Sequence, residues 1–267
     1  MVGILLLASL WAIGVGGLYV FQRSLVFQPD SSPPESAWSA SAKNVTLHPS
    51  DGLDLHAWVF EPTALDLDAA ILIAPGNAGN RGTRAGVAAR LADLGYTVLL
   101  LDYRGYGGNP GDPSEEGLAL DALAAASWLR SAGFPPGRTL YVGQSLGTGV
   151  VVRLAATNPP GAMLLQSPYT SMVAVAQGKF PLVPFDLLLK DRFDTMRYLH
   201  ELTMPITVLA GGRDTLVPAS QSAAVAEATP NLFRYVETPD ADHNDIYWSG
   251  PGLPAQVDEL ARAALHI

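Results

Sequence analysis

Short, wholly apolar runs alternate along most of the chain with stretches in which apolar residues recur at helical spacing. The apolar runs fall at residues 69–74, 98–101, 140–142, 163–165 and 206–209. The helical patterns fall near residues 81–94, 116–131, 146–157, 219–228 and 254–265. Runs of this kind are typical of strands that are buried on both faces, because helices cover both sides of a parallel sheet. The order predicts an α/β fold with a doubly wound, mostly parallel sheet.

Two further strand patterns flank this series. Apolar and polar residues alternate on either side of Asp51-Gly52, from Val45 to Val59. A dipeptide of this type between alternating segments predicts a β-hairpin, so we expect an antiparallel hairpin to open the sheet. Another strand is expected near residues 232–236.

The N-terminal segment carries no charge from residue 2 to residue 21, and Arg23 is the first charged side chain. Twenty helical residues reach about 30 Å, the thickness of a bilayer's hydrocarbon core. We therefore expect a single-pass membrane anchor helix over residues 1–22. A Pro/Ser-rich linker is expected over residues 23–42, and one catalytic domain over residues 43–267. The flanking charges are too few to indicate on which side of the membrane the domain lies.

Two alternatives to an anchor remain open for this segment. A cleaved signal peptide would need a basic start and a small-residue cleavage site directly after the apolar run. The segment lacks both, since Ala40-Ser41-Ala42 lies beyond the Pro/Ser-rich stretch. A buried core helix would usually be shorter and bounded by capping residues.

Composition excludes several classes of protein. With 48% hydrophobic and 15% charged residues, the chain can form a large core, which excludes a mainly disordered protein. The net charge is −9 and Lys and Arg form no run, so the basic surface of a nucleic-acid binder is missing. The absence of cysteine excludes disulfides, a thiolate nucleophile and Cys-ligated metals. No metal-binding spacing occurs, and we expect neither a metal nor a cofactor.

The segment Gly143-Gln144-Ser145-Leu146-Gly147 follows an expected strand and begins an expected helix. This is the G-x-S-x-G pattern in the strand–turn–helix context that gives it meaning. The sharp turn presents the serine oxygen above the carboxyl edge of the sheet, and the glycines allow the neighbouring backbone to pass close by. Ser145 is therefore predicted to be a nucleophile.

A serine hydroxyl needs a base to accept its proton, and the base needs an acid to orient it. In this fold the acid and then the base follow the serine along the chain. Asp214 lies in the loop after the strand at residues 206–209, and His243 follows the strand near 232–236. Taken singly, each could be an ordinary loop residue; together they predict a Ser145/Asp214/His243 triad. The remaining histidines are expected to be structural or exposed: His48, His56, His200 and His266.

An oxyanion hole requires two backbone N–H groups that face the developing negative charge. We expect these donors from Leu146, directly after the nucleophile, and from Asn77 in the Gly-rich loop after residues 69–74. The alternative is a loop that only connects to the next helix. The segment at residues 102–108 is expected to be structural, with Arg104 bonding to carbonyls or to Asp102.

Residues 167–203 form a short insert, so no large cap domain is expected. Its apolar side chains predict either a groove for an acyl chain or a pair of helices that simply cover the sheet. The candidate substrate-binding residues are Tyr169, Phe180, Leu182 and Phe185.

Several motifs together resemble the α/β-hydrolase superfamily. They are GNAGN (76–80), DYRGYG (102–107), PSEEGLALDA (113–122), GQSLG (143–147), SPYTS (167–171), GGRDTLVP (211–218) and HND (243–245). More narrowly, the chain looks like a small membrane-anchored group related to α/β-hydrolase-domain protein depalmitoylases. That group commonly has His-Gly before the Asn, where this chain has Pro75-Gly76. The resemblance implies hydrolysis of esters or thioesters.

These observations predict a serine hydrolase that cleaves carboxylic esters or thioesters through an acyl-enzyme. Because a membrane anchor would hold the domain at a bilayer, a lipid or lipidated substrate is a reasonable hypothesis. A peptidase or amidase using the same triad is the nearest alternative. A non-catalytic binding protein would have no reason to keep every catalytic part. The sequence does not indicate an oligomeric state.

Overall fold

An eight-stranded sheet forms the centre of the computed structural model, which describes residues 2–35, 38–265 and 267. The strands lie in the order β10-β9-β8-β7-β4-β6-β3-β2. Their bounds are β2 (Lys43–Leu47), β3 (Leu55–Phe60), β4 (Ala70–Ala74), β6 (Thr97–Leu100), β7 (Thr139–Gln144), β8 (Ala162–Gln166), β9 (Ile206–Gly211) and β10 (Leu232–Thr238). Strand β3 is antiparallel to both β2 and β6, and all other pairs are parallel. The predicted α/β fold with an opening hairpin is confirmed.

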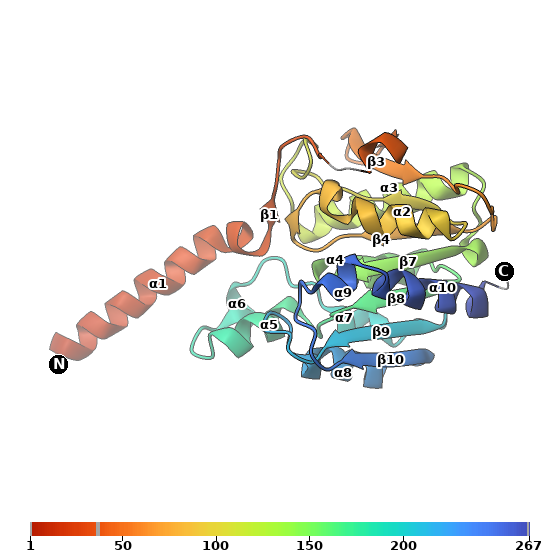
Figure 1. Ribbon diagram of the computed structural model, residues 1–267. Coiled ribbons are helices and arrows are strands. Elements are labelled where there is room, and N and C mark those ends of the chain that lie inside the picture. The colour runs from red at the N-terminus through yellow and green to blue at the C-terminus, as the bar shows by residue number, and fades with distance from the viewer. Residues whose placement is uncertain (1, 36–37, 266) are drawn as a thin grey trace.

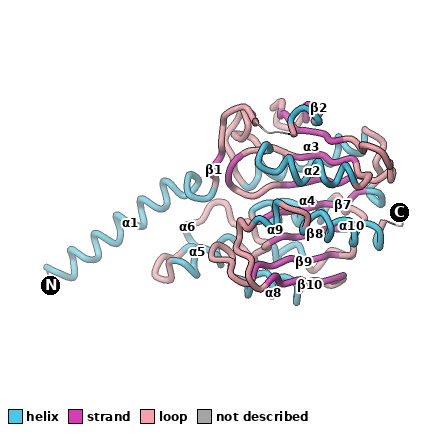
Figure 2. The backbone as a smooth tube through the Cα atoms, in the orientation of Figure 1, coloured by secondary structure: helices cyan, strands magenta, loops and turns pink. Residues whose placement is uncertain are grey.

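Helices cover both faces of the sheet (Figures 1 and 2). One face carries α2 (Ala85–Asp93) and α10 (Gly252–Ala264), and the other carries α3 (Glu115–Ser131), α4 (Leu146–Thr157) and α8 (Ala219–Ala228). Neighbouring residues of β4 pack into the two hydrophobic cores on opposite faces of the sheet. Ile71 packs into the core under α2 and α10, whereas Leu72 packs into the core under α3 and α4. Burial on both faces explains why the strand sequences are apolar without alternation.

Short helices complete the fold. The insert between β8 and β9 contains α5 (Met172–Lys179), α6 (Phe185–Leu188) and α7 (Thr195–Leu199). Helix α9 (Ile246–Ser249) precedes α10, and single turns of 3₁₀ helix occur at η1 (Ser39–Ser41), η2 (Arg81–Arg84) and η3 (Pro136–Arg138). The insert therefore adds a small helical layer rather than a separate cap domain.

Helix α1 (Val2–Val26) projects away from the body of the protein (Figure 1). Its segment Gly3–Val26 is long and apolar enough to cross a membrane, judged by length and composition. The helix runs four residues beyond the expected anchor, into the expected linker. Strand β1 (Gln28–Pro29) then pairs in parallel with β5 (Ala78–Gly79). This part of the expected linker is therefore bound to the domain; residues 36–37 lie outside the described residues.

The sheet changes its winding direction next to β4. From β4 the chain passes to β6 on one side and then returns to β7 on the other side. In open α/β sheets, ligands bind beyond the carboxyl ends of the strands at such a switch point. The loop after β4 and the turn after β7 both start there, so the topology brings the Asn77 loop to the Ser145 turn.

The loop after β6 is structural, but its ion pairs differ from the expected ones. Arg104 does not bond to Asp102; its guanidinium lies 2.7 Å from Asp121 Oδ1 and 2.6 Å from Asp51 Oδ2. Asp102 instead pairs with Arg81 at 2.8 Å. The chain turns at Gly105 and Gly107, both with positive φ, and this turn directs Arg104 away from its neighbour. Burial raises the pKa of Asp102 to about 6, although the contacts with Arg81 act in the opposite direction. Its Oδ1 atom has no hydrogen-bond partner among the described residues.

The other described histidines lie at the surface. His48, His56 and His200 are exposed, and His48 pairs with Asp54 at 2.7 Å. His266 lies outside the described residues.

Candidate active site

Ser145 directly follows β7 and occupies the N-cap position of α4 in a strained backbone conformation. Its φ is 50° and its ψ is −115°, a left-handed region that non-glycine residues rarely adopt. The two glycines of the motif have no room for a side chain. A Cβ atom at Gly147 would collide with the carbonyl oxygen of Ala74, and one at Gly143 would lie 2.7 Å from the carbonyl oxygen of Gly147. The close approach of α4 to β4 therefore requires glycine and presents the serine above the sheet.

The structure brings Ser145, His243 and Asp214 together from three loops. His243 Nε2 lies 2.9 Å from Ser145 Oγ, and His243 Nδ1 lies 2.6 Å from Asp214 Oδ2. The Asp214 and His243 side chains are buried, whereas the serine faces a cavity. With Nδ1–H donating to the carboxylate, Nε2 is free to accept the proton of the serine hydroxyl. This geometry is that of a nucleophile, a base and an orienting acid.

The loops of the acid and the base are fixed to each other. Asp214 Oδ1 accepts hydrogen bonds from the N–H groups of Leu216 and Val217, at 2.9 and 2.7 Å. Asp242 Oδ1 accepts from the His243 N–H at 2.7 Å and from the Thr215 N–H at 3.2 Å. These hydrogen bonds lower the pKa of Asp242 below its ordinary value, and the bond from the His243 N–H has the largest effect. Sequence reasoning missed this positioning residue; its place directly before the histidine was the available signal.

The two expected oxyanion donors lie at the cavity. Leu146 and Asn77 both line it beside Ser145. Among the described residues, neither of these two backbone N–H groups donates a hydrogen bond to another protein group. Unpaired N–H groups at a cavity wall can donate hydrogen bonds to a negatively charged oxygen.

The Asn77 loop is held by neighbours on both sides. The carbonyl oxygen of Asn77 accepts hydrogen bonds from the Gln28 N–H at 2.9 Å and from the Tyr106 hydroxyl at 2.8 Å. Its side-chain amide donates to the carbonyl oxygen of Val26 at 2.8 Å. The Tyr103 hydroxyl donates to the carbonyl oxygen of Pro75 at 2.9 Å. The end of α1 and the tyrosines after β6 therefore set the conformation of this loop.

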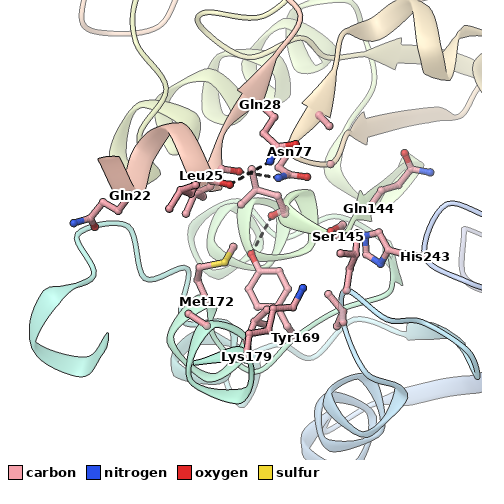
Figure 3. Close-up of a pocket in the computed structure, with 18 of the residues that line it drawn as sticks. Gln22, Leu25, Gln28, Asn77, Gln144, Ser145, Tyr169, Met172, Lys179 and His243 are labelled. Carbon is pink, nitrogen blue, oxygen red and sulfur yellow. Dashed lines mark hydrogen bonds between the residues drawn. The ribbon is translucent and has the colours of Figure 1, made fainter. Parts of the chain in front are cut away.

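A cavity of about 410 Å³ opens over Ser145 and His243 (Figure 3). Of the four candidate substrate-binding residues, Tyr169, Phe180 and Phe185 line it. Leu182 does not line it, because the turn between α5 and α6 directs this side chain into solvent, where it is 81% exposed. Much of the remaining lining is aliphatic. These residues are Leu25, Val26, Met172, Val175, Ala176, Leu189, Leu216 and Val217.

One wall of the cavity is the last part of α1, which sequence reasoning did not assign to the site. Leu18, Gln22 and Leu25 share one helix face and line the cavity. Gln22 is buried; its side chain accepts from the Lys190 N–H at 2.7 Å and donates to the Leu188 carbonyl at 3.2 Å. In the sequence this residue is only a glutamine directly after the apolar run, which does not by itself indicate a place in the site. These bonds fix α1 against the α5–α6 insert.

The described residues offer no evident metal site. Within residues 2–35 and 38–265, no three His, Asp or Glu side chains gather closely enough to hold an ion.

Comparison with known proteins agrees with this architecture. Residues 69–193 match the family model for the alpha/beta hydrolase fold. The Pyrococcus furiosus esterase Pf2001 superposes with a TM-score of 0.71 at 21% identity, covering 89% of this chain and 99% of the esterase. The chain therefore has the α/β-hydrolase fold.

Relatives in sequence cover most of the chain. It is 41% identical to "Uncharacterized protein Rv2307c" of Mycobacterium tuberculosis, over 88% of this chain and 86% of that protein. It is 29% identical to "Lysophosphatidylserine lipase ABHD12" of Danio rerio, over 88% of this chain and 73% of that protein.

Proposed function

We propose that the chain is a membrane-anchored serine hydrolase that cleaves carboxylic esters or thioesters through an acyl-enzyme on Ser145. The observation that carries this proposal is the continuous hydrogen-bonded series from Ser145 Oγ through His243 to Asp214, at the floor of a largely apolar cavity. Esterases and a lipase among the structural neighbours and sequence relatives support the same reaction class.

Acylation begins when His243 Nε2 accepts the proton of the Ser145 hydroxyl. The serine oxygen forms a bond to the acyl carbon, and the carbonyl π electrons move to the oxygen, which the Asn77 and Leu146 N–H groups hold. Asp214 stabilises the imidazolium cation and fixes its orientation. As the tetrahedral intermediate collapses, the bond to the leaving group breaks. His243 returns the proton to the departing oxygen or sulfur, which leaves as an alcohol or thiol.

Deacylation repeats these steps with water as the nucleophile. His243 takes one proton from the water, and the hydroxyl oxygen bonds to the acyl carbon. Collapse of the second intermediate breaks the bond to Ser145, and His243 returns the proton to the serine oxygen. The products are a carboxylic acid and the free enzyme, so protons and atoms balance over the cycle.

The apolar cavity favours an acyl chain as the group that the enzyme retains. Its aliphatic walls come from both α1 and the α5–α6 insert. If α1 lies in a bilayer, these walls meet the membrane surface, and a hydrocarbon chain can move between them without full exposure to water. Burial of each methylene contributes about 0.8 kcal/mol. The proposed substrate is therefore a lipid or a lipidated molecule with an ester or thioester bond.

The proposal is tested with purified full-length protein in detergent micelles. Wild type and Ser145→Ala are compared on p-nitrophenyl esters of four to sixteen carbons, an acyl thioester and a matched p-nitroanilide. We expect turnover of esters and thioesters by wild type, a preference for longer chains, and no turnover by Ser145→Ala. Ser131→Ala, an exposed serine in the last turn of α3, is the matched control and should keep wild-type rates. A preferred p-nitroanilide would indicate an amidase, and equal rates for the two serine variants would refute the proposal.

A further inference from the structure

The cavity over Ser145 is lined by cationic side chains although the protein is acidic. The chain has 25 Asp and Glu residues against 16 Lys and Arg residues, a net charge of −9. Arg84 and Lys179 line the cavity, whereas none of the described residues that line it is Asp or Glu. A cleft with one sign of charge attracts ligands of the opposite sign.

Arg84 is held at the cavity wall without a counter-ion. Its Nε–H donates to Gln144 Oε1 at 2.9 Å, and no carboxylate of the described residues lies within ion-pair distance of it. Nine other arginines of the protein have a carboxylate partner. Burial lowers the pKa of Arg84, yet a guanidinium remains charged in proteins. A half-buried charge without a partner is costly, so a bound anion would stabilise it.

Gln144 fixes the guanidinium close to the nucleophile. It directly precedes Ser145 in the chain, and its Nε2 donates to Gln166 Oε1 at 2.9 Å. Both amide groups line the cavity beside Arg84. The series Arg84–Gln144–Gln166 therefore sets the position of the Arg84 side chain, whose two Nη atoms have no protein partner among the described residues.

The polar and apolar parts of the cavity lie on different sides of Ser145. In Figure 3, Gln144 and His243 lie to one side of the serine, and Gln22 and Leu25 of α1 lie to the other. His243 must reach the leaving group, because it returns a proton to that group when the bond breaks. The leaving group therefore occupies the side near Gln144 and Arg84, and the acyl chain occupies the side near α1.

We infer that Arg84 forms a binding subsite for an anion on the leaving group of the substrate. The inference rests on the proposed acyl transfer at Ser145 and adds a substrate class to it, namely acyl esters of an alcohol that carries a phosphate or a carboxylate. The free Nη atoms of a guanidinium suit either group, since both offer paired oxygens for two parallel hydrogen bonds. Lys179, at the end of α5, adds a second positive charge to the same cavity.

The test compares three substrates with one acyl chain: dodecanoyl glycerol, dodecanoyl glycerol phosphate and dodecanoyl glycerate. Each is measured below its micellar concentration with full-length wild type, Arg84→Gln and Arg90→Gln. Arg90 lies on α2 and is exposed, so its substitution is the matched control for loss of one positive charge. We expect Arg84→Gln to lower the ratio of kcat/KM for anionic over neutral ester by about 10- to 100-fold, the range for hydrogen bonds to charged groups. Arg90→Gln should leave the ratio unchanged.

The outcomes separate the subsite from the catalytic proposal. If Arg84→Gln lowers the ratio of kcat/KM only for the phosphate ester over the neutral ester, the subsite binds a phosphate. If it lowers the ratio only for the glycerate ester, the subsite binds a carboxylate. A fall in both supports an anion subsite without selection between them. An equal loss on neutral and anionic esters would mean that Arg84 only orients Gln144, and would overturn the inference, as would unchanged ratios.

A labelling experiment covers the case in which none of the three esters is turned over. A fluorophosphonate that labels Ser145 is competed with dodecyl phosphate or with dodecanol. Dodecyl phosphate should protect wild type better than dodecanol does, and Arg84→Gln should lose that difference. Equal protection by the two compounds would overturn the subsite while labelling upheld the nucleophile. Absence of labelling would instead refute the proposed function.

Discussion

Replacing Asp214 by asparagine should disable the histidine while leaving the loop in place. In the structure, Asp214 Oδ1 accepts from the Leu216 and Val217 N–H groups, and Oδ2 faces His243 Nδ1 at 2.6 Å. An asparagine that keeps its oxygen on the two N–H groups turns its NH₂ group toward Nδ1. Nδ1 must then be unprotonated, and the proton moves to Nε2, which can no longer accept a proton from Ser145.

The expected losses of kcat and of the free energy of unfolding depend on which hydrogen bonds of Asp214 each variant keeps. Wrong-tautomer substitutions in serine triads lower kcat by about 10⁴-fold, or about 5.5 kcal/mol of transition-state stabilisation. Since both backbone bonds survive in Asp214→Asn, its free energy of unfolding should fall by less than about 1 kcal/mol. Asp214→Ala loses those bonds as well and leaves two N–H groups unpaired, at a cost of about 1–3 kcal/mol each if they stay buried.

Two measurements test this reasoning. Ester turnover with p-nitrophenyl butyrate gives kcat, and urea unfolding followed by circular dichroism gives the free energy of unfolding. We expect both variants to be nearly inactive, with Asp214→Ala clearly less stable than Asp214→Asn. If Asp214→Asn kept more than a tenth of the wild-type kcat with its fold intact, the carboxylate would not orient His243 as argued.

Three further substitutions have expected outcomes. Gly147→Ala should lower Tm, because the added Cβ atom would collide with the Ala74 carbonyl oxygen and overpacking costs about 1–3 kcal/mol. Gly137→Ala, at a position with open space, should not lower Tm. Equal Tm values for the two variants would contradict the close approach of α4 to β4. Leu25→Gln should reduce the preference for twelve- over four-carbon esters by about fourfold per lost methylene contact, whereas Phe21→Gln, off the cavity, should preserve it. Asp102 has a raised pKa in the folded state, so its contribution to stability is complete below about pH 3.8 and is lost as pH rises through about 6. The free energy of unfolding of wild type, measured in urea relative to that of Asp102→Asn, should therefore fall by about 3 kcal/mol across that window; a constant difference would contradict it.

The parts of the fold and site that the sequence predicts are those encoded locally or by chain order. Each strand buried on both faces is a short apolar run, so β4 and β7 are visible without tertiary information. Ser145 is visible because the turn needs glycine two residues before and after it. Asp214 and His243 follow from the order of the triad along the chain.

The remaining features depend on contacts between distant segments. Gln22 bonds to residues 166 and 168 positions further along the chain, and no local pattern encodes that distance. The same holds for Arg104, whose partners are Asp51 and Asp121 rather than the neighbouring Asp102. Leu182 was predicted from its apolar character alone, but the direction of a turn decides whether such a side chain reaches the cavity. Arg84 lies in a glycine-rich stretch whose sequence gives no sign that its charge lacks a partner.

The proposed reaction requires an acyl-enzyme on Ser145. Rapid mixing of full-length protein with a p-nitrophenyl ester, followed by acid quenching, peptide digestion and mass spectrometry, tests it most directly. We expect a burst of close to one equivalent of p-nitrophenol and an acyl group on the peptide that contains Ser145. Ser145→Ala should give neither. An acyl group on another residue, or an undiminished burst in Ser145→Ala, would mean that Ser145 is not the nucleophile.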